Sequence, residues 1–471
     1  MQLRVPPHSA STLGVVLCLL VSGFFHLKIY AQQLQPAQQP DRVARDAWHK
    51  SMKKTPLPRH GCFMATYPST EWQETKCTAA PNIPFAPKVG SAPQTVGDGN
   101  DFVAQATSGL ISSSEGSFPN SGGVASESGY VGGTPPAAAN SFSLQLNSNY
   151  FYNAPQCSGA ANPSLCQGWQ QFIFAEGNSG SGAVFIQYWL LDYGTACPPN
   201  WTESSIPGET NCWMNSTSST YTPPMQASDI PYMTLSGSTA NGTDTAIFDQ
   251  YSGGTIYSLA QSNVLNLDQN WTGAEFNVFG DAGGSEANFN NGSTFVVQTS
   301  VTNGTSNMPQ CLGPQGAGAG TTAETNNLSL IPQTAPLCCP YSASSPYIQF
   351  LESNATGATA SCGANGLVSN ISPPPYATNG SEKIITYPII QGEIRIEYSA
   401  TLEYVGSEGA ITYQFLNSCD ASLGSATVDS GSTVGYVNAE IDGQPCTYGF
   451  HGTMSATAPG YVPSPYTGII F

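Results

Sequence analysis

The chain has 471 residues, of which 30 are acidic and 12 are basic, so its formal net charge is −18. Half of the basic residues lie between positions 32 and 60, whereas residues 89–471 hold two cations against 26 carboxylates. A body this acidic offers no electrostatic footprint for nucleic acid or an anionic membrane surface, so we expect neither partner. Histidine is absent from residues 61–450. This absence argues against Ser–His–Asp and Cys–His catalysis and against most zinc sites.

The N-terminal segment 1–31 predicts a secretory signal. Arg4 lies in the leading region, and an apolar run from Leu13 to Phe25 has the length of a signal-peptide core. His26 ends that run well short of the roughly 20 apolar residues that a membrane span requires. We therefore expect a secreted, extracellular protein that is not embedded in a membrane.

Residues 32–60 form a basic leader. It starts with the Gln- and Pro-rich stretch QQLQPAQQP and continues with DRVARDAWHKSMKK, which is typical of a charged amphipathic helix. A cationic leader before an acidic body predicts a propeptide that pairs with carboxylates at neutral pH and is released in acid, as in a zymogen. The alternative is a disordered basic linker.

Twelve cysteines remain after the signal segment, an even number that predicts up to six disulfides in an exported chain. The near pairings are Cys62–Cys77, Cys157–Cys166 and Cys197–Cys212. No CxxC pair occurs, so we expect no metal. About ten N-x-S/T sequons are consistent with a secreted glycoprotein.

The chain after the leader is punctuated by Gly, Pro, Asn and Ser, and its apolar residues occur in short runs rich in Val, Ile, Phe, Tyr and Thr. This pattern predicts an all-β protein. The clearest runs are at 141–151, 182–191, 293–301 and 393–405.

The length after the leader favours two domains. We expect an antiparallel β-sandwich over 95–310 as the candidate catalytic domain and a smaller β-rich domain over 345–471. A loop-rich segment containing cysteines precedes them at 61–94. The Gly- and Thr-rich composition of 311–344 predicts a linker between them.

Two segments place amides beside aromatic residues. GWQQFIF contains the adjacent amides Gln170 and Gln171. In VFIQYWLLDYG, a strand places Phe185, Gln187 and Trp189 on one face. An aromatic face with one amide suits a groove for an extended polymer, and the alternative is a sandwich strand whose glutamine reaches solvent.

A third segment, TGAEFNVF, places Glu275 on the same strand face as Asn277. A carboxylate on a partly covered sheet beside a polar neighbour can hold a raised pKa, which suits acid–base chemistry. The alternative is an ordinary solvated glutamate.

The order of these segments resembles the eqolisins, the glutamic peptidases. AEFNVFGD and ANFNNGSTFVV are similar to the region of the catalytic glutamate in that family. WQQFIF followed by FIQYWLLDYG is similar in order to the strand with the catalytic glutamine and the aromatic strand after it. GWQ followed by FIQYW also resembles the neprosin peptidases of plants. The resemblance covers residues 140–300.

The resemblance implies a lectin-like jelly-roll sandwich and an acid endopeptidase that needs no metal or cofactor. Glu275 would be the general base that activates water, and a glutamine amide would stabilise the oxyanion. Two glutamines stand where the family has one. We favour Gln171, which shares a strand face with Trp169, and Gln170 stays an alternative. The implied substrate is a protein or peptide, bound by a monomer in a groove formed by Trp169, Phe185, Gln187, Trp189 and Asn277.

Two other functions fit the same residues. One is a secreted, non-catalytic, lectin-like protein that binds carbohydrate or mediates adhesion through the aromatic groove. The other is a glycosidase in which Glu275 pairs with Asp192 or Glu176.

Overall fold

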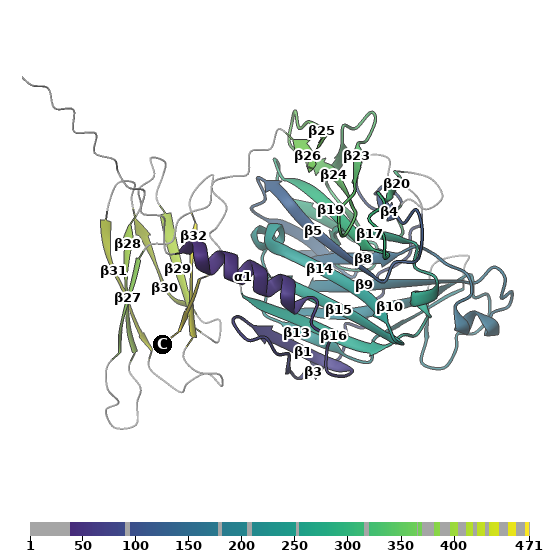
Figure 1. Ribbon diagram of the computed structural model, residues 1–471, viewed down its shortest axis with the longest axis horizontal. Helices are drawn as coiled ribbons and strands as arrows, with labels where there is room; N and C mark the ends of the chain where they lie inside the picture. The colour runs from purple at the N-terminus through teal and green to yellow at the C-terminus, as the bar shows by residue number, and fades with distance from the viewer. Residues whose placement is uncertain are drawn as a thin grey trace, which may run out of the picture. The chain divides into compact units, whose positions relative to one another are not determined.

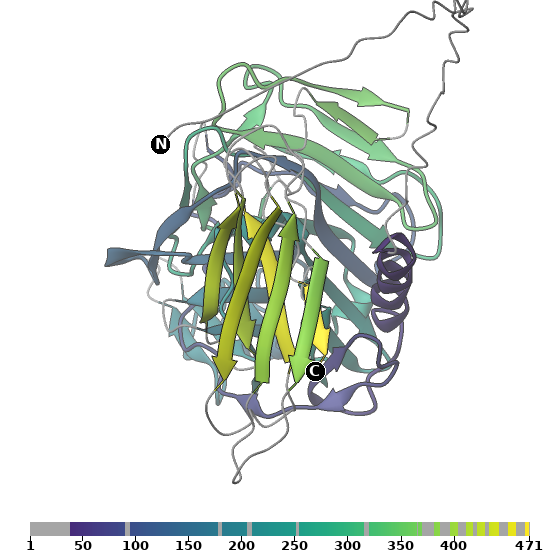
Figure 2. The same cartoon turned by 90° about the vertical axis from the view of Figure 1, so that its left-hand side faces the viewer.

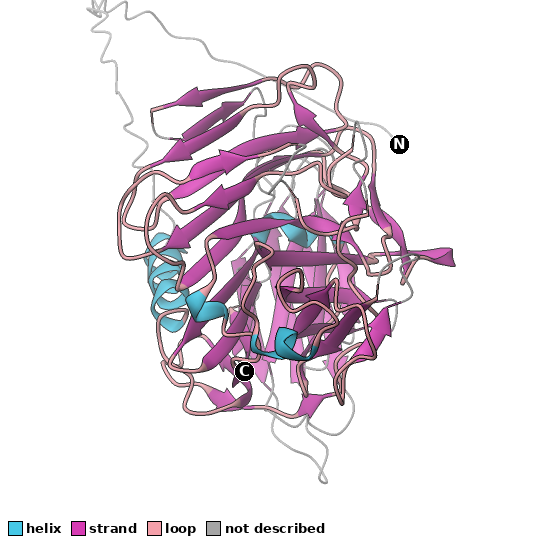
Figure 3. Cartoon of the chain, turned by 90° about the vertical axis from the view of Figure 1, so that its right-hand side faces the viewer, coloured by secondary structure: helices cyan, strands magenta, loops and turns pink. Residues whose placement is uncertain are grey.

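A computed structural model describes residues 38–89, 95–177, 181–204, 210–250, 254–314, 320–364 and 366–369, and the backbone of seven further strands up to residue 470. The expected signal at 1–31 and the first residues of the leader lie outside these ranges. Strands dominate the described chain, and helices are few (Figure 3). The expected all-β, antiparallel sandwich is confirmed.

Two large sheets make up the body (Figure 1). Sheet 1 contains, in spatial order, β2 (Gln73–Glu74), β1 (Gly61–Thr66), β16 (Thr255–Ser262), β15 (Thr243–Gln250), β14 (Met233–Ala240), β5 (Ser113–Gly122), β19 (Thr294–Thr302), β24 (Tyr347–Ser353) and β22 (Ser329–Ile331), with β23 (Cys338–Tyr341) also paired to β24. All of these pairings are antiparallel.

Sheet 2 carries the strands that the sequence singled out. Its order is β11 (Thr202–Ser204), β12 (Asn211–Asn215), β10 (Ser181–Leu191), β9 (Gln167–Gly177), β8 (Phe142–Ser148), β17 (Gly273–Gly280), β4 (Val103–Gln105) and β20 (Gln310–Leu312). In addition, β13 (Ser219–Thr222) pairs with β10 and with β3 (Cys77–Thr78).

The core lies between the two sheets because alternate residues of their strands are large and apolar. Phe174 of sheet 2 stacks on Phe248 of sheet 1 with ring centroids 3.9 Å apart. Glycines in sheet 1 make room for such rings. A Cβ atom on Gly116 would lie 1.8 Å from the ring of Phe276, and one on Gly237 would lie 2.3 Å from the ring of Phe172. The two sheets therefore interlock through side chains that only glycine accommodates.

The linker expected over 311–344 is part of the body instead. It supplies residues to β20 in sheet 2 and to β22 and β23 in sheet 1. β24, which was expected to belong to the second domain, pairs with β19 in sheet 1. Composition suggested a linker because these strands are short and lie between turns, but hydrogen bonds to distant strands hold them in the sheets.

Smaller elements complete the described chain. The short sheets contain β21 (Thr325–Asn326), β18 (Glu286–Phe289), β6 (Glu127–Val131) and β7 (Thr134–Ala139), and separately β25 (Ala360–Gly363) and β26 (Gly366–Ser369). Three 3₁₀ turns cover Pro155–Gly159, Ala227–Tyr232 and Leu267–Gln269.

In the part of the chain that the structure describes, the strands after residue 380 pair with one another (yellow-green in Figure 2). One sheet has the order β27 (Ser381–Thr386), β28 (Ile396–Glu403) and β31 (Thr433–Ile441). The other has the order β30 (Ser422–Val428), β29 (Ile411–Asn417), β32 (His451–Thr457) and β33 (Thr467–Ile470). The second β-rich domain expected over 345–471 stays a prediction, except that β24 belongs to sheet 1.

The disulfides confirm the three predicted pairings, Cys62–Cys77, Cys157–Cys166 and Cys197–Cys212. Of two more, Cys311–Cys338 joins β20 of sheet 2 to β23 of sheet 1, and Cys339–Cys362 joins β23 to β25. Five disulfides indicate a chain that folds in an oxidising compartment, such as the extracellular space. Among the described residues, no helix is long and apolar enough to span a bilayer.

The leader forms the predicted helix, α1 (Gln38–Met52). Its buried Trp48 and Met52 pack against Ile247 and Ile256 on the outer face of sheet 1. The chain after the helix places Lys53 2.8 Å from a Glu115 carboxylate oxygen. The leader therefore contacts sheet 1 through both apolar and charged side chains.

Candidate active site

A row of polar side chains crosses four neighbouring strands of sheet 2. Glu275 on β17 lies opposite Asn147 on β8, Asn147 lies opposite Gln171 on β9, and Gln171 lies opposite Gln187 on β10. Directly opposed residues of antiparallel strands point to the same face of the sheet. The candidate glutamate, the favoured glutamine and the groove amide therefore share one face.

The alternation of the strands creates this row. In β8, Leu144 and Leu146 enter the core, whereas Gln145 and Asn147 point the opposite way. The sequence of 141–151 carries that pattern, but Asn147 was not chosen as a site residue. Its place beside Glu275 depends on the pairing of β8 with β17, which no local pattern reveals.

Glu275 is fully buried, and its two carboxyl oxygens have different surroundings. Oε2 accepts hydrogen bonds from the Asn147 amide at 3.1 Å, from the Thr321 backbone N–H at 2.8 Å and from the Thr321 hydroxyl. Oε1 has no hydrogen-bond partner in the protein. Burial raises the pKa of the Glu275 carboxyl, and the bonds from Thr321 and Asn147 oppose that rise only in part.

Two amide oxygens of the row are, like Glu275 Oε1, buried without a hydrogen-bond partner in the protein. Gln171 donates from Nε2 to Gln145 Oε1 at 3.1 Å, while its own Oε1 has no partner in the protein. Asn147 Oδ1 likewise has none. Because buried polar atoms are rarely left unsatisfied, the three oxygens suit donors from solvent or from a ligand.

Gln170 does not belong to this row. It lies opposite Tyr188 on the other face of sheet 2, and its backbone N–H donates to the Ser148 hydroxyl. The geometry therefore brings Gln171 together with Glu275 and keeps Gln170 apart.

The residues predicted to form an aromatic groove lie next to the row, but they are completely buried rather than open to solvent. Trp169 and Trp189 are opposite each other with ring centroids 6.2 Å apart, and Trp213 on β12 extends the series at 6.4 Å. Phe185 contacts Phe85 at 5.7 Å between centroids. Sequence reasoning missed Trp213, because only the pairing of β10 with β12 places it there.

Asn277 lies two residues beyond Glu275 on the same strand face, and its amide is engaged inside the protein. Nδ2 donates to Asp101 at 3.2 Å and to Glu352 at 2.9 Å. It therefore holds two buried carboxyls rather than lining an open surface.

These carboxyls are an unpredicted part of the site. Burial raises the pKa of Asp101 well above its ordinary range, and the neighbouring Glu275 and Glu352 raise it further. Burial also raises the pKa of Glu352 to about 8. Because the three groups lie close together, ionising one disfavours ionisation of the others. No local sequence pattern marks Asp101 or Glu352.

The partners considered for a glycosidase lie elsewhere. Glu176 is on the opposite face of β9 from Gln171 and accepts a hydrogen bond from the Met225 N–H. Asp192 is exposed after the end of β10. Neither shares the face of Glu275. In the described part of the chain, no three His, Cys, Asp or Glu side chains are grouped so that they could hold a metal ion.

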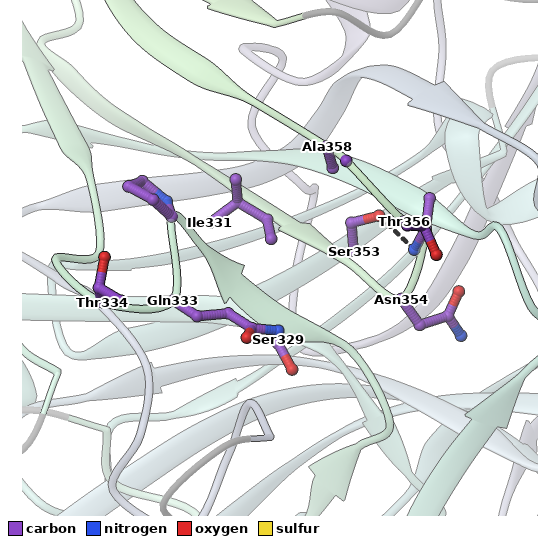
Figure 4. A pocket seen from close by; sticks show the side chains of 11 residues that line it. Ser329, Ile331, Gln333, Thr334, Ser353, Asn354, Thr356 and Ala358 are labelled. Carbon is purple, nitrogen blue, oxygen red and sulfur yellow. Dashed lines mark hydrogen bonds between the residues drawn. The ribbon is translucent and has the colours of Figure 1, made fainter.

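A separate surface hollow of about 540 Å³ lies between β22 and the chain that follows β24 (Figure 4). Its lining includes Ser329, Gln333 and Thr356 but no ionisable side chain. It therefore has no group for acid–base chemistry.

A comparison with protein-family models gave no match, and no curated protein is significantly similar to the chain in sequence. The functional interpretation consequently depends on the residues of the site.

Proposed function

We propose that the protein is a secreted, acid-acting glutamic-type endopeptidase with Glu275 as its general base and Gln171 as its oxyanion stabiliser. The observation that supports this most directly is the position of both residues in one row, with a single strand between them. Two strand spacings, roughly 9–10 Å, leave room for a peptide bond between the side chains.

The chemistry uses only residues of the chain. The Glu275 carboxylate accepts a proton from water while the water oxygen bonds to the peptide carbonyl carbon. The Gln171 N–H donates to the oxyanion of the tetrahedral intermediate. Glu275 then returns the proton to the leaving nitrogen as the C–N bond breaks.

The buried state of Glu275 suits a latent form. Burial favours the protonated carboxyl, which cannot act as a base. Exposing the row to solvent would lower the pKa of Glu275 and restore the carboxylate at moderately acidic pH. Opening of the site and activation of the base are thus one event in this proposal.

The test acidifies the purified exported protein to between pH 2 and 6. It follows loss of residues 32–60 by mass spectrometry and digestion of a denatured protein by gel. We expect Glu275→Gln to lower the cleavage rate by about 10³-fold and Gln171→Leu by about 10²-fold. Glu203→Gln, on an exposed glutamate, is the matched control and should leave the rate unchanged. Full activity of Glu275→Gln would assign the base to another residue.

The second candidate function is binding of a glycan without cleavage, and the series Trp169, Trp189 and Trp213 favours it. Flat aromatic rings along one face suit sugar rings as well as peptide side chains. Binding to a glycan panel at neutral and acidic pH, with no digestion of protein, would support this function over the peptidase.

A further inference from the structure

Residues 81–88, here called the strap, cross the row of polar side chains. Gln187 contacts the strap main chain at two points, accepting from the Phe85 N–H at 2.7 Å and donating to the Ile83 carbonyl at 3.1 Å. Asn215, the next residue of the row on β12, donates to the Pro81 carbonyl at 2.6 Å. Amide side chains of sheet 2 therefore hold the strap by its main chain.

The other end of the strap reaches the cover of Glu275. Ala86 donates from its backbone N–H to Glu324 Oε1 at 3.0 Å, and the Lys88 N–H donates to the Thr321 carbonyl at 2.9 Å. Thr321 in turn donates to Glu275. A continuous set of hydrogen bonds thus links the strap to the candidate base.

The chemistry of these contacts indicates what the groove accepts. Gln187 contacts one carbonyl and one N–H two residues apart, which is how a protein holds an extended peptide without reading its sequence. Two strap residues, Phe85 and Pro87, are buried, and the ring of Phe85 lies beside that of Phe185 on β10. The part of sheet 2 beneath the strap therefore combines main-chain hydrogen bonds with an aromatic contact to Phe85.

We propose that the strap occupies the candidate active site as a built-in mimic of its ligand. The ligand is an extended polypeptide whose main chain is held by Gln187 and Asn215. The catalytic consequence, inhibition by the strap, rests on the proposed peptidase function, whereas occupancy of the groove does not. Substrate reaches Glu275 only after the strap has left.

The ends of the strap permit a selective test. Val89, directly after the strap, is 71% exposed and accessible to a protease. Before the strap, the Cys62–Cys77 disulfide anchors the chain to the body. A cut at residue 89 would therefore leave the strap attached at one end only and free to exchange.

The experiment inserts the recognition sequence of a site-specific protease at Val89 and, as a matched control, at the exposed turn of Gly242. Both proteins are cut and assayed at acidic pH on a denatured protein substrate. Binding of a fluorescein-labelled peptide, PNIPFAPK, is measured by anisotropy. We expect the cut at 89 to raise cleavage at least tenfold and to permit peptide binding, and the cut at 242 to do neither. The Gln187→Leu/Asn215→Leu variant of the cut protein should bind the peptide at least tenfold more weakly.

Each result separates the two proposals. Peptide binding without any cleavage supports the strap proposal and overturns the peptidase. Cleavage that the cut at 89 leaves unchanged, with no peptide binding, overturns the strap proposal and leaves the peptidase. Loss of the native circular dichroism spectrum after the cut at 89, but not at 242, would make the strap part of the core and would also overturn its proposed role.

Discussion

The two large sheets are both covered on their outer faces, but by different chemistry. Sheet 1 carries the basic leader, in which Lys53 lies 2.8 Å from Glu115 and 3.4 Å from Asp249, and His49 Nδ1 lies 2.9 Å from Asp249. Sheet 2 carries the strap, whose main chain is bound mainly by the uncharged amides of Gln187 and Asn215. Ion pairs and apolar contacts attach the leader, whereas hydrogen bonds to the strap main chain, from two amides and the Glu324 carboxyl, attach the strap.

This difference separates the responses of the covers to acid. Protonation of carboxylates removes the negative half of each ion pair between the leader and sheet 1 and leaves the apolar contacts in place, whereas the amides of Gln187 and Asn215 do not titrate. The leader, predicted to be a propeptide released in acid, contacts sheet 1, whereas the segment that crosses the row in sheet 2 is the strap. Acid would therefore weaken the attachment of the leader to sheet 1. Release of the strap from sheet 2 would instead need a cut in the chain or a competing peptide.

The largest predicted effect is the pH dependence of the folding stability of the body, which both covers contact. Burial raises the pKa of Glu127, Glu176 and Glu352 to about 8 and that of Asp281 to about 7. The folded state then binds protons that the unfolded state releases, so stability is complete below about pH 4 and is lost as the pH rises towards 8. We expect a loss of several kcal/mol and a Tm lower by about 10 °C at pH 8 than at pH 4.5 in thermal melts. A Tm that rises with pH would contradict this.

Removal of the leader's buried cation is the next largest effect. Burial lowers the pKa of Lys53, but Glu115 and Asp249 raise it further, so its pKa is above the usual value. Lys53→Met leaves the completely buried Asp249 without that cation, and we expect a loss of about 3 kcal/mol in urea unfolding at pH 7. The leader should also be digested faster by added trypsin. Lys54→Met, on the exposed neighbour, is the control, and an equal loss there would contradict a specific role for Lys53.

The local sequence pattern was sufficient to predict which side chains share a strand face in sheet 2. Alternation in 168–174 separated Gln171 from Gln170, and the pairing of β9 with β8 and β17 places Gln171 in the row of Glu275. Short loops likewise predicted three disulfides, because cysteines close in sequence meet easily.

No local sequence pattern indicated which segments cover the site. The strap and residues 321–323 are more than 230 residues apart, yet Ala323 donates to Ala86. Neither segment has a period of two, because each is held by a few hydrogen bonds rather than by a ladder. The same reason explains why Asp101 and Glu352 were missed and why 311–344 was interpreted as a linker.

A smaller predicted change in stability depends on one buried carboxyl of the body, that of Glu127. Glu127 accepts a hydrogen bond from the Ser141 N–H at 2.7 Å, and an amide oxygen can accept it equally well. Because Glu127→Gln cannot ionise, we expect the variant to match the parent at pH 4.5 and to be about 2 kcal/mol more stable at pH 8. Urea unfolding at both pH values measures this, with Glu203→Gln as the exposed control. A variant less stable than the parent at pH 8 would show that ionised Glu127 stabilises the fold.

The smallest effect concerns a charge pair at the surface after the leader helix. Arg59 pairs with Glu74, and their side chains are 65% and 56% exposed. We expect Glu74→Gln to cost at most about 0.5 kcal/mol in urea unfolding and nothing measurable in 1 M salt, because water and ions screen an exposed pair. A cost close to that of Lys53→Met would mean that the number of charge pairs, rather than their burial, determines how strongly the leader is attached. A negligible cost would leave Lys53, with its completely buried partner Asp249, as the charged group that contributes to attachment of the leader.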